Sequence, residues 1–460
     1  MSDAQPKGYK LTKFNLVMAD DGDNTTMTDD ISPEKGSVVD IRNICSGWRY
    51  FESIDVPSLR MEFAIFDTND LVSGLTGNEL IEIEIESDCS PGLPLTISQR
   101  IFKIGAVTKS ERAQAYVLFT VSPEMINNES NKVFKVFREN SGSSHVKSII
   151  KEHLKSSGKK YSFEPSKGNF NFISPSWRPF DAISYIQDKI VSEETQTAGY
   201  TFYENKHGYY FHTLDWHCSD KNPTKENHPV YIYEQANVGD STDNTYKIES
   251  INFPDRANHL EKMRTGAYSN TVIGIKLPAL TSGNLPSSST EEESKSSGSI
   301  NPPLHMGLNS VFGIAKEGGA ILNDQFPYPK IKPKYFEDSN PTRTKIRALP
   351  GMKDAKNDKD STGSAGNMDY DTVSASAYSF SRWQLLNAIT LDITVPGNVG
   401  LYVGMIIECL IPSSAKEENR TVPDPIYSGL YLVTGLEHSY TREGITTFLK
   451  LSKDSVQTPN

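Results

Sequence analysis

Histidine and cysteine side chains, which are the groups best suited to bind a transition metal, come together at one place in the sequence. The segment FHTLDWHC contains His212, His217 and Cys218. A structural zinc site needs four ligands in a fixed geometry, so this cluster would still require a fourth. We therefore interpret the segment as the end of a strand with histidines at the surface, and we predict no metal site.

Motifs of the main catalytic classes are missing. The sequence contains no GxSxG, HExxH, P-loop or GxGxxG pattern. Gly397, Gly400 and Gly404 lie in VPGNVGLYVG, and their spacing matches no dinucleotide fingerprint. His438 follows a predicted strand in LEHSYTREG, where a single histidine is more typical of a hydrogen-bonded structural residue than of a base. We therefore predict that the protein is not an enzyme and that it has no cofactor.

Composition and charge indicate a folded, acidic protein and argue against one that wraps nucleic acid. The 460 residues are 36% apolar and 10% aromatic, which is enough for a packed core. At about 150 residues per domain, the chain has about three domains. Lys and Arg number 47 against 58 Asp and Glu, which gives a net charge of −11. An acidic protein is a poor candidate for wrapping nucleic acid, because phosphate binding needs a basic surface.

Signals for membranes and secretion are absent as well. No apolar run reaches the length of about 18 residues that a transmembrane helix needs. The first ten residues, MSDAQPKGYK, lack the apolar region of a secretory signal. The four cysteines form no CxxC pair, and we interpret them as free thiols of a protein made in a reducing cytoplasm.

Residues 1–130 have the pattern of strands and turns. In LIEIEIE, from Leu80 to Glu86, isoleucines alternate with glutamates, which is typical of a half-buried strand with one acidic face. The acidic face consists of Glu82, Glu84 and Glu86. Further strands are predicted at Arg60–Leu71, Ile101–Val107 and Ala115–Val121.

Residues 131–215 change to a mixed character. One helical face collects the apolar side chains of HVKSIIKEHLKSS, namely Val146, Ile149, Ile150 and Leu154. A second helix begins at Pro179. A hairpin follows, with strands Tyr200–Tyr203 and Tyr209–Thr213, and Gly208 supplies the positive φ that its loop tends to need. We predict a small α+β domain.

Strand character returns in residues 216–282 and 372–460. Between them, residues 283–371 are rich in Pro, Gly, Asp and Lys, with little periodicity. Their polar run SGNLPSSSTEEESKSSGS cannot bury a core. We therefore predict an irregular insertion at 283–371, with no compact fold of its own at residues 283–300.

The C-terminal segment contains a VPGN turn from Val395 to Asn398, an SG pair at Ser428 and Gly429, and His438 in LEHSYTREG. With these residues it resembles the closing barrel strands of the baseplate central hub proteins of contractile-tailed phages. In that family a VPGN turn precedes a strand, SG followed by an apolar residue opens the next, and a histidine ends it. The matching positions here are Pro396, Gly397, Asn398, Gly404, Gly429 and His438. ISPSWRPFDAISYIQDKIV with GYTFYENKHGYYFHTLD, and also VFRENSGSSHVKSIIKEHL, are similar to the middle domain of that family. PSLRMEFAIFDTNDLVSGLTGNELIEIEI is similar to its N-terminal barrel.

The resemblance implies a mainly β, α+β architecture. Two tube-type antiparallel β-barrel domains, residues 1–130 and residues 216–282 with 372–460, would carry the smaller α+β domain at 131–215. Residues 283–371 depart from the family pattern. Three copies would present six barrel modules and so adapt a sixfold tail tube to a threefold spike.

The resemblance also implies partners and a location. The partners are two further copies of the chain, the central spike protein, and a tail tube or tube-initiator protein, and they extend to baseplate wedge and tape-measure proteins. DNA would pass through without specific binding, and no membrane is involved. The protein would lie in the baseplate of the virion tail, after assembly in the host bacterial cytoplasm.

A channel for DNA should repel phosphate, and an acidic wall does so over about 8–10 Å in physiological salt. Glu82, Glu84 and Glu86 are the candidates for lining it, and the alternative is an ordinary solvated outer face. Two other functions stay open. One is the hub of a type VI or other contractile-injection spike, which usually continues into a long β-helical needle. The other is a tail-associated cell-wall hydrolase, which would have to use residues 283–371.

Overall fold

The computed structural model describes ten stretches of the chain: residues 9–18, 38–156, 158–233, 244–254, 258–276, 304–327, 343–349, 372–417, 420–441 and 444–457. The low-complexity run at 283–300, for which we predict no compact fold, lies outside these residues.

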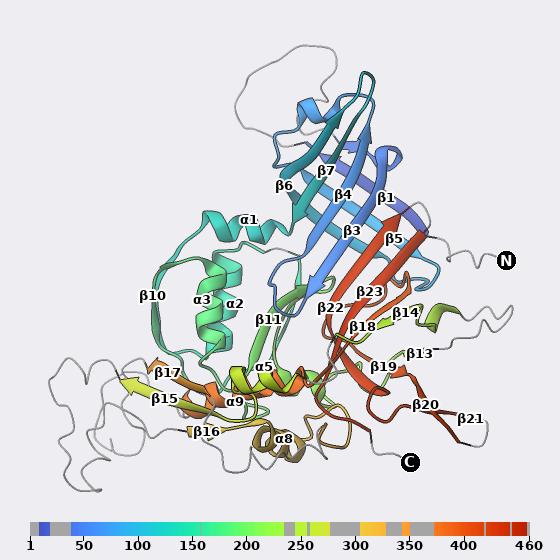
Figure 1. The fold of residues 1–460 in the computed structure, drawn as a ribbon. Coiled ribbons are helices and arrows are strands. Elements are labelled where there is room, and N and C mark those ends of the chain that lie inside the picture. The colour runs from blue at the N-terminus through green and yellow to red at the C-terminus, as the bar shows by residue number, and fades with distance from the viewer. Residues whose placement is uncertain are drawn as a thin grey trace, which may run out of the picture.

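A large sheet dominates the molecule, and it joins both ends of the chain (Figure 1). Its strands follow in the order β14 (Ser250–Asn252), β18 (Ile389–Pro396), β23 (Gly444–Lys453), β22 (Gly429–Thr441), β3 (Cys45–Ser53), β4 (Arg60–Asp67), β7 (Gln114–Val121), β6 (Leu95–Lys109), β5 (Leu80–Ser87), β1 (Tyr9–Val17) and β2 (Val38–Asp40). β19 (Ile406–Leu410) pairs with β22, and β13 (Val230–Ile232) pairs with β19. Because β22 pairs with β3, the strands predicted in two barrel domains continue in one hydrogen-bonded sheet.

Alternation of apolar and polar residues explains which face of the sheet is buried. In β5, Ile81, Ile83 and Ile85 are buried, whereas the glutamates between them lie on the other face. The same period holds in β4 and β18, and their buried side chains join one core with those of β22 and β23. The mainly β, α+β fold class predicted from the sequence is confirmed.

The middle domain packs helices on two small sheets. β8 (Val133–Phe137) pairs with β10 (Phe172–Trp177), while β9 (Lys160–Phe163), β12 (Gly208–Thr213) and β11 (Tyr200–Asn205) form the second sheet. The helices are α1 (Pro123–Ser130), α2 (Gly142–Glu152), α3 (Pro179–Gln187) and α4 (Leu214–Cys218). The predicted apolar face of α2 is buried against α3 and β12. The hairpin turn is shorter than predicted, because Asn205 already pairs with Gly208, which has φ 132°.

A third layer covers the lower end of the sheet, and part of it differs from the expected irregular insertion. Residues 304–306 form β16 (Leu304–Met306), which pairs with β15 (Asn270–Lys276), and residues 308–317 form helix α8 (Leu308–Glu317). β17 (Arg343–Leu349) pairs with the other edge of β15. Helix α9 (Thr372–Leu386), which the sequence analysis did not predict, packs against α8.

The remaining described elements are short. They are helix α5 (His259–Thr265), the hairpin of β20 (Pro412–Glu417) with β21 (Arg420–Pro423), and the 3₁₀ turns η1 (Arg42–Ile44), η2 (Leu71–Gly74) and η3 (Asn244–Tyr246). No helix in the described stretches is long and apolar enough to cross a membrane.

Candidate functional site: a buried junction of three chain segments

The loop between β18 and β19 meets both the N-terminal strands and the middle domain. This loop ends at Ile406, where β19 begins. Position 397 requires glycine because Ile445 packs closely against it. A Cβ there would lie 1.8 Å from Cγ2 of Ile445 and 2.6 Å from its carbonyl oxygen. Gly404 has φ 89°, and its Cβ would lie 2.1 Å from the hydroxyl of Tyr203.

Asn398 ties this loop to the sheet. Its backbone N–H donates to the Thr447 hydroxyl at 3.1 Å, and its side-chain amide donates to the Tyr231 hydroxyl at 3.2 Å. The same Thr447 hydroxyl is hydrogen-bonded to Nδ1 of His438 at 2.9 Å. The structure therefore connects Asn398 and His438, two candidate residues that lie 40 positions apart in the sequence.

His438 lies within β22 rather than at its end, and its imidazole is fully buried. The ring stacks on Tyr50 of β3 with centroids 5.7 Å apart. Burial lowers the pKa of His438 to about 3, so the side chain is neutral in the folded protein at pH 7. It lies where β22 joins β3, opposite Tyr50 in the register of the two strands.

Glu52 of β3 is the carboxylate at the centre of the junction. One of its oxygens accepts hydrogen bonds from the Tyr50 hydroxyl at 2.5 Å and from the backbone N–H of Lys206 at 2.8 Å. Its other oxygen accepts from the backbone N–H of Val403 at 2.6 Å. The N-terminal strands, the middle-domain hairpin and the C-terminal loop therefore share one buried side chain. Burial raises the pKa of Glu52 to about 7.

The tip of the β11–β12 hairpin completes the junction. The ammonium group of Lys206 donates to the carbonyl oxygens of Val399 at 2.6 Å and Gly400 at 2.8 Å. The amide of Asn205 donates to the carbonyl oxygen of Val403 at 3.1 Å. Burial lowers the pKa of Lys206 to about 8. These bonds satisfy the carbonyl groups of a loop that has no strand partner of its own.

Stability should fall below pH 6.5 because of His438. Its pKa is about 6.5 in the unfolded chain and about 3 in the fold, so only the unfolded chain takes up a proton between these values. The contribution of His438 to the free energy of unfolding is present above pH 6.5. It is lost at about 1.4 kcal/mol per pH unit as the pH falls. Urea unfolding at pH 7 and pH 5 should show that His438→Gln loses about 2 kcal/mol less than the wild type over this interval. Equal losses in both proteins would contradict the assignment.

Gly429 lies at a second buried network, away from the junction. It opens β22 with φ 120°, and a Cβ would lie 2.7 Å from Oδ1 of Asn323. Asn323 donates to and accepts from the backbone of Leu430 at 3.2 and 3.0 Å, which fixes the residues after α8 to β22. Gly429 is thus enclosed within the chain itself.

Arg382 of α9 is the charged centre of this second region, and it is not among the residues predicted from the sequence. Its guanidinium donates to Asp215 of α4 at 2.6 Å, to Asp454 after β23 at 2.8 Å and to the carbonyl oxygen of Ala320 at 2.8 Å. All three charged side chains are fully buried. No local pattern marks them, because Arg382 lies 167 and 72 residues from its partners.

The histidine cluster at the end of the hairpin is buried, which corrects the expectation of surface histidines. His212 stacks on Trp216 with ring centroids 3.7 Å apart, and Cys218 and His217 are fully enclosed. Burial lowers the pKa of His212 to about 2 and that of His217 to about 3. Within the described residues, no group of three or more His, Cys, Asp or Glu side chains is placed to hold a metal ion. Cys45, Cys218 and Cys409 are free thiols.

The glutamates of β5 share one face, as their spacing predicts, but the strand beside them is basic. Glu82 forms an ion pair with Lys13 of β1 at 2.5 Å. Glu86 lies opposite Lys10 in the register of β1 and β5. Glu84 has no ion pair within the described residues, so the negative charge of this face is reduced at its Glu82 end.

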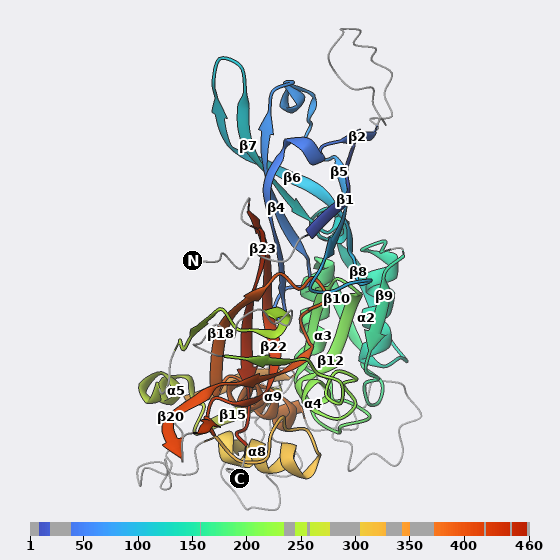
Figure 2. The same cartoon turned by 90° about the vertical axis from the view of Figure 1, so that its right-hand side faces the viewer.

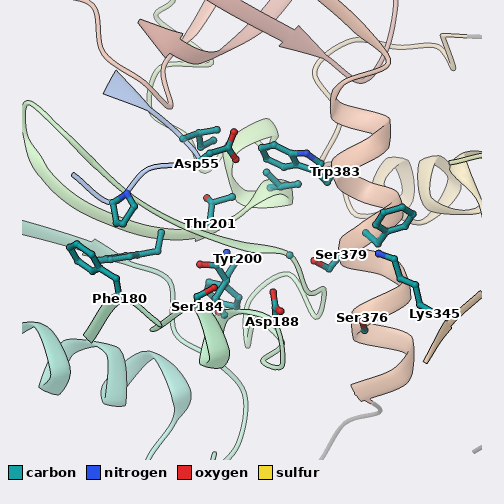
Figure 3. Close-up of a pocket in the computed structure, with 17 residues that line it drawn as sticks. Asp55, Phe180, Ser184, Asp188, Tyr200, Thr201, Lys345, Ser376, Ser379 and Trp383 are labelled. Carbon is teal, nitrogen blue, oxygen red and sulfur yellow. The ribbon is translucent and has the colours of Figure 1, made fainter. Parts of the chain in front are cut away.

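A cavity of about 340 Å³ lies between the middle domain and α9 (Figure 3). Asp55 and Asp188 contribute carboxylates, and Lys345 of β17 contributes an ammonium group that lies over the ring of Phe380. Hydroxyl groups from α3 and α9 complete its polar lining.

The fold as a whole can be compared with solved structures. A tail protein from Neisseria meningitidis MC58 superposes with a TM-score of 0.50 at 11% sequence identity, over 97% of each chain. The chain shares the fold of that tail protein. The resemblance to tail hub proteins predicted from the sequence is thus confirmed for the fold.

Two further structures are similar. The 43 kDa tail protein of prophage MuSo2 from Shewanella oneidensis has a TM-score of 0.48 and 9% identity, over 96% of this chain and 99% of that one. The E. coli c3393 protein, a component of the type VI secretion system, has a TM-score of 0.40 and 8% identity, over 91% and 76%. No family model and no curated protein matches the sequence.

Proposed function

We propose that this chain is a structural virion protein: a trimeric baseplate hub that connects the sixfold tail tube to the threefold central spike and forms part of the channel for DNA ejection. The observation that carries the proposal is the tail-protein fold, which extends over 97% of both chains. It therefore includes the large sheet, the middle domain and the layer around α9. No step in this role needs a catalytic group.

The sheet of a single chain has open edges, and this supports the proposal that several copies assemble into a ring. Among the described strands, the sheet ends at β2 on one side and at β14 on the other. Exposed strand edges invite further pairing, and closure of a sheet removes them. In a cyclic trimer each contact joins two different surfaces, and the ring closes after three copies. The two strand-rich units, residues 1–130 and residues 216–282 with 372–460, would act as its paired barrel modules.

The buried junction supports the proposed role as an adaptor, because it holds the parts of the chain together as one body. Glu52 and Lys206 join all three parts of the chain by hydrogen bonds of 2.6–2.8 Å. In this proposal Pro396, Gly397, Asn398, Gly404, Gly429 and His438 are structural residues that shape the junction and the start of β22.

The channel wall in this proposal is net acidic, and the β5 face contributes to it chiefly through Glu84 and Glu86. Lys13 offsets the charge of Glu82. A structure of the assembled trimer tests this assignment, because it gives the distance of each charged side chain from the threefold axis. An excess of Lys and Arg at the inner wall would contradict it.

Mass and symmetry test the proposal directly. Light scattering on the purified full chain should give three times the monomer mass of 51.2 kDa. Mixing with the central spike protein should give a complex that contains three copies of this chain, and tube-initiator, wedge and tape-measure proteins should bind the same trimer. A monomer both with and without the spike protein would overturn the trimeric hub.

A further inference from the structure

The middle domain carries an exposed apolar surface that no described part of the chain covers. This surface lies on the outer face of the two-stranded sheet β8–β10, where Val136 pairs with Ile173 and Phe134 pairs with Pro175. Phe134 is 79% exposed and Ile173 is 63% exposed. Large apolar side chains that cluster in this way on a surface mark an interaction site.

The same face is basic. Side chains alternate along a strand, so one face of β8 and its flanks presents four exposed residues in a row: Lys132, Phe134, Val136 and Arg138. Neither Lys132 nor Arg138 has an ion-pair partner within the described residues. This face thus presents two cations, although the chain as a whole has a net charge of −11. Figure 2 shows α2, β8 and β9 together along one edge of the molecule. We call the surface formed by Lys132, Phe134, Val136, Arg138 and Ile173 the basic face.

A surface of opposite character lies around β13 and β14. Among the described residues 226–233 and 244–254, Glu226 and Glu249 stand against one lysine, Lys247. Glu226 and Glu249 are exposed in this region, beside the partly exposed apolar side chains of Ile232, Tyr246 and Phe253. These elements are contiguous, since Ile232 bridges to Lys247 and η3 leads into β14. We call the surface formed by Glu226, Ile232, Tyr246, Glu249 and Phe253 the acidic flank.

The two surfaces lie on opposite sides of the molecule. Figure 1 shows β10 at one edge and β13 with β14 at the other. One copy therefore cannot bring its own two surfaces together, whereas a neighbouring copy can. A ring of identical chains needs two different surfaces that fit each other, one on each side of the subunit.

We propose that the basic face of each copy docks on the acidic flank of the next copy, with apolar side chains at the centre of the contact and opposite charges at its rim. This inference rests on the trimer proposed above and names the surfaces that form it. Apolar contact with charged rims is the usual anatomy of a protein interface, and complementary charge fixes which surfaces meet.

Charge reversal tests the contact in the full chain. Lys132→Glu with Arg138→Glu, or Glu226→Lys with Glu249→Lys, should each weaken self-association about tenfold or more in sedimentation velocity near 0.15 M salt. The four changes together restore opposite charge and should recover association to within about threefold of the wild type. All four side chains lie at the surface or its margin, and melting curves confirm that each variant is folded.

Lys109→Glu with Arg112→Glu is the matched control, because it makes the same change in net charge at the exposed end of the β6–β7 hairpin. It should leave association unchanged. An equal effect in this control, or no recovery in the fourfold variant, would overturn the contact. A wild-type trimer that neither reversal weakens would overturn the contact and leave the hub proposal standing. A wild type that stays monomeric with and without the spike protein would overturn both.

Discussion

Replacing Arg382 with methionine should destabilise the folded chain by about 3–5 kcal/mol, because it leaves two fully buried carboxylates without their cation. Asp215 would retain the hydroxyl of Tyr378 at 2.7 Å, and Asp454 would retain the backbone N–H of Leu322 at 3.1 Å. These neutral donors do not replace a charge at a fully buried site. The loss should appear as a lower midpoint in urea and thermal unfolding at pH 7.

Arg42→Met is the matched control for this substitution. Arg42 also holds an aspartate with its guanidinium, Asp40 at 2.6 Å, but both side chains are largely exposed. Water and salt screen such pairs, so the control should unfold close to the wild type. A loss below about 1 kcal/mol for Arg382→Met would show that the aspartates are protonated or hydrated in the fold.

Gly397→Ala should cost about 3 kcal/mol and loosen the junction. The new Cβ would lie 1.8 Å from Ile445 Cγ2 and 2.6 Å from its carbonyl oxygen, so the loop or β23 must move. Movement would strain the hydrogen bond from Gly397 N–H to that oxygen, now 3.0 Å, and the bond from the Ser87 hydroxyl to Gly397. Urea unfolding would measure the loss, and light scattering would show whether trimers persist.

Gly313→Ala provides the control for adding one methyl group. Gly313 is exposed in α8, and a Cβ there meets nothing within 4 Å. Alanine should stabilise the helix by about 0.5–1 kcal/mol, since glycine disfavours helix interiors. If both alanine variants have wild-type stability, close approach at Gly397 is not a constraint on the fold.

Helix α9 shows where local patterns fail. Buried side chains occur around much of its circumference, and they include Val373, Ala377, Arg382 and Leu386. A helix enclosed on most sides has no single apolar face, so it gives no clear periodic signal. The helix α8 on which it packs lies in a segment predicted as irregular, and its apolar face is buried in one cluster with side chains of α9.

The sequence by itself determined the local elements whose pattern depends on one buried face. The alternation in β5, the apolar face of α2 and the start of α3 at Pro179 all agree with the structure. Gly397, Gly404 and Gly429 were singled out by the resemblance alone, and the structure shows a close approach at Gly397 and positive φ at Gly404 and Gly429. Periodicity shows that a face is buried, and a glycine shows that space or φ is restricted, without naming the neighbour.

Only the tertiary structure decided which segments meet. The pairing of β22 with β3 joins residues almost 400 positions apart, and no local rule specifies it. The partners of Glu52, Arg382 and His438 are likewise set by the packing of distant segments, which also buries these side chains. Burial also shifts the pKa values of two of these side chains. The pKa of Glu52 rises and that of His438 falls, because the fold removes water from around both.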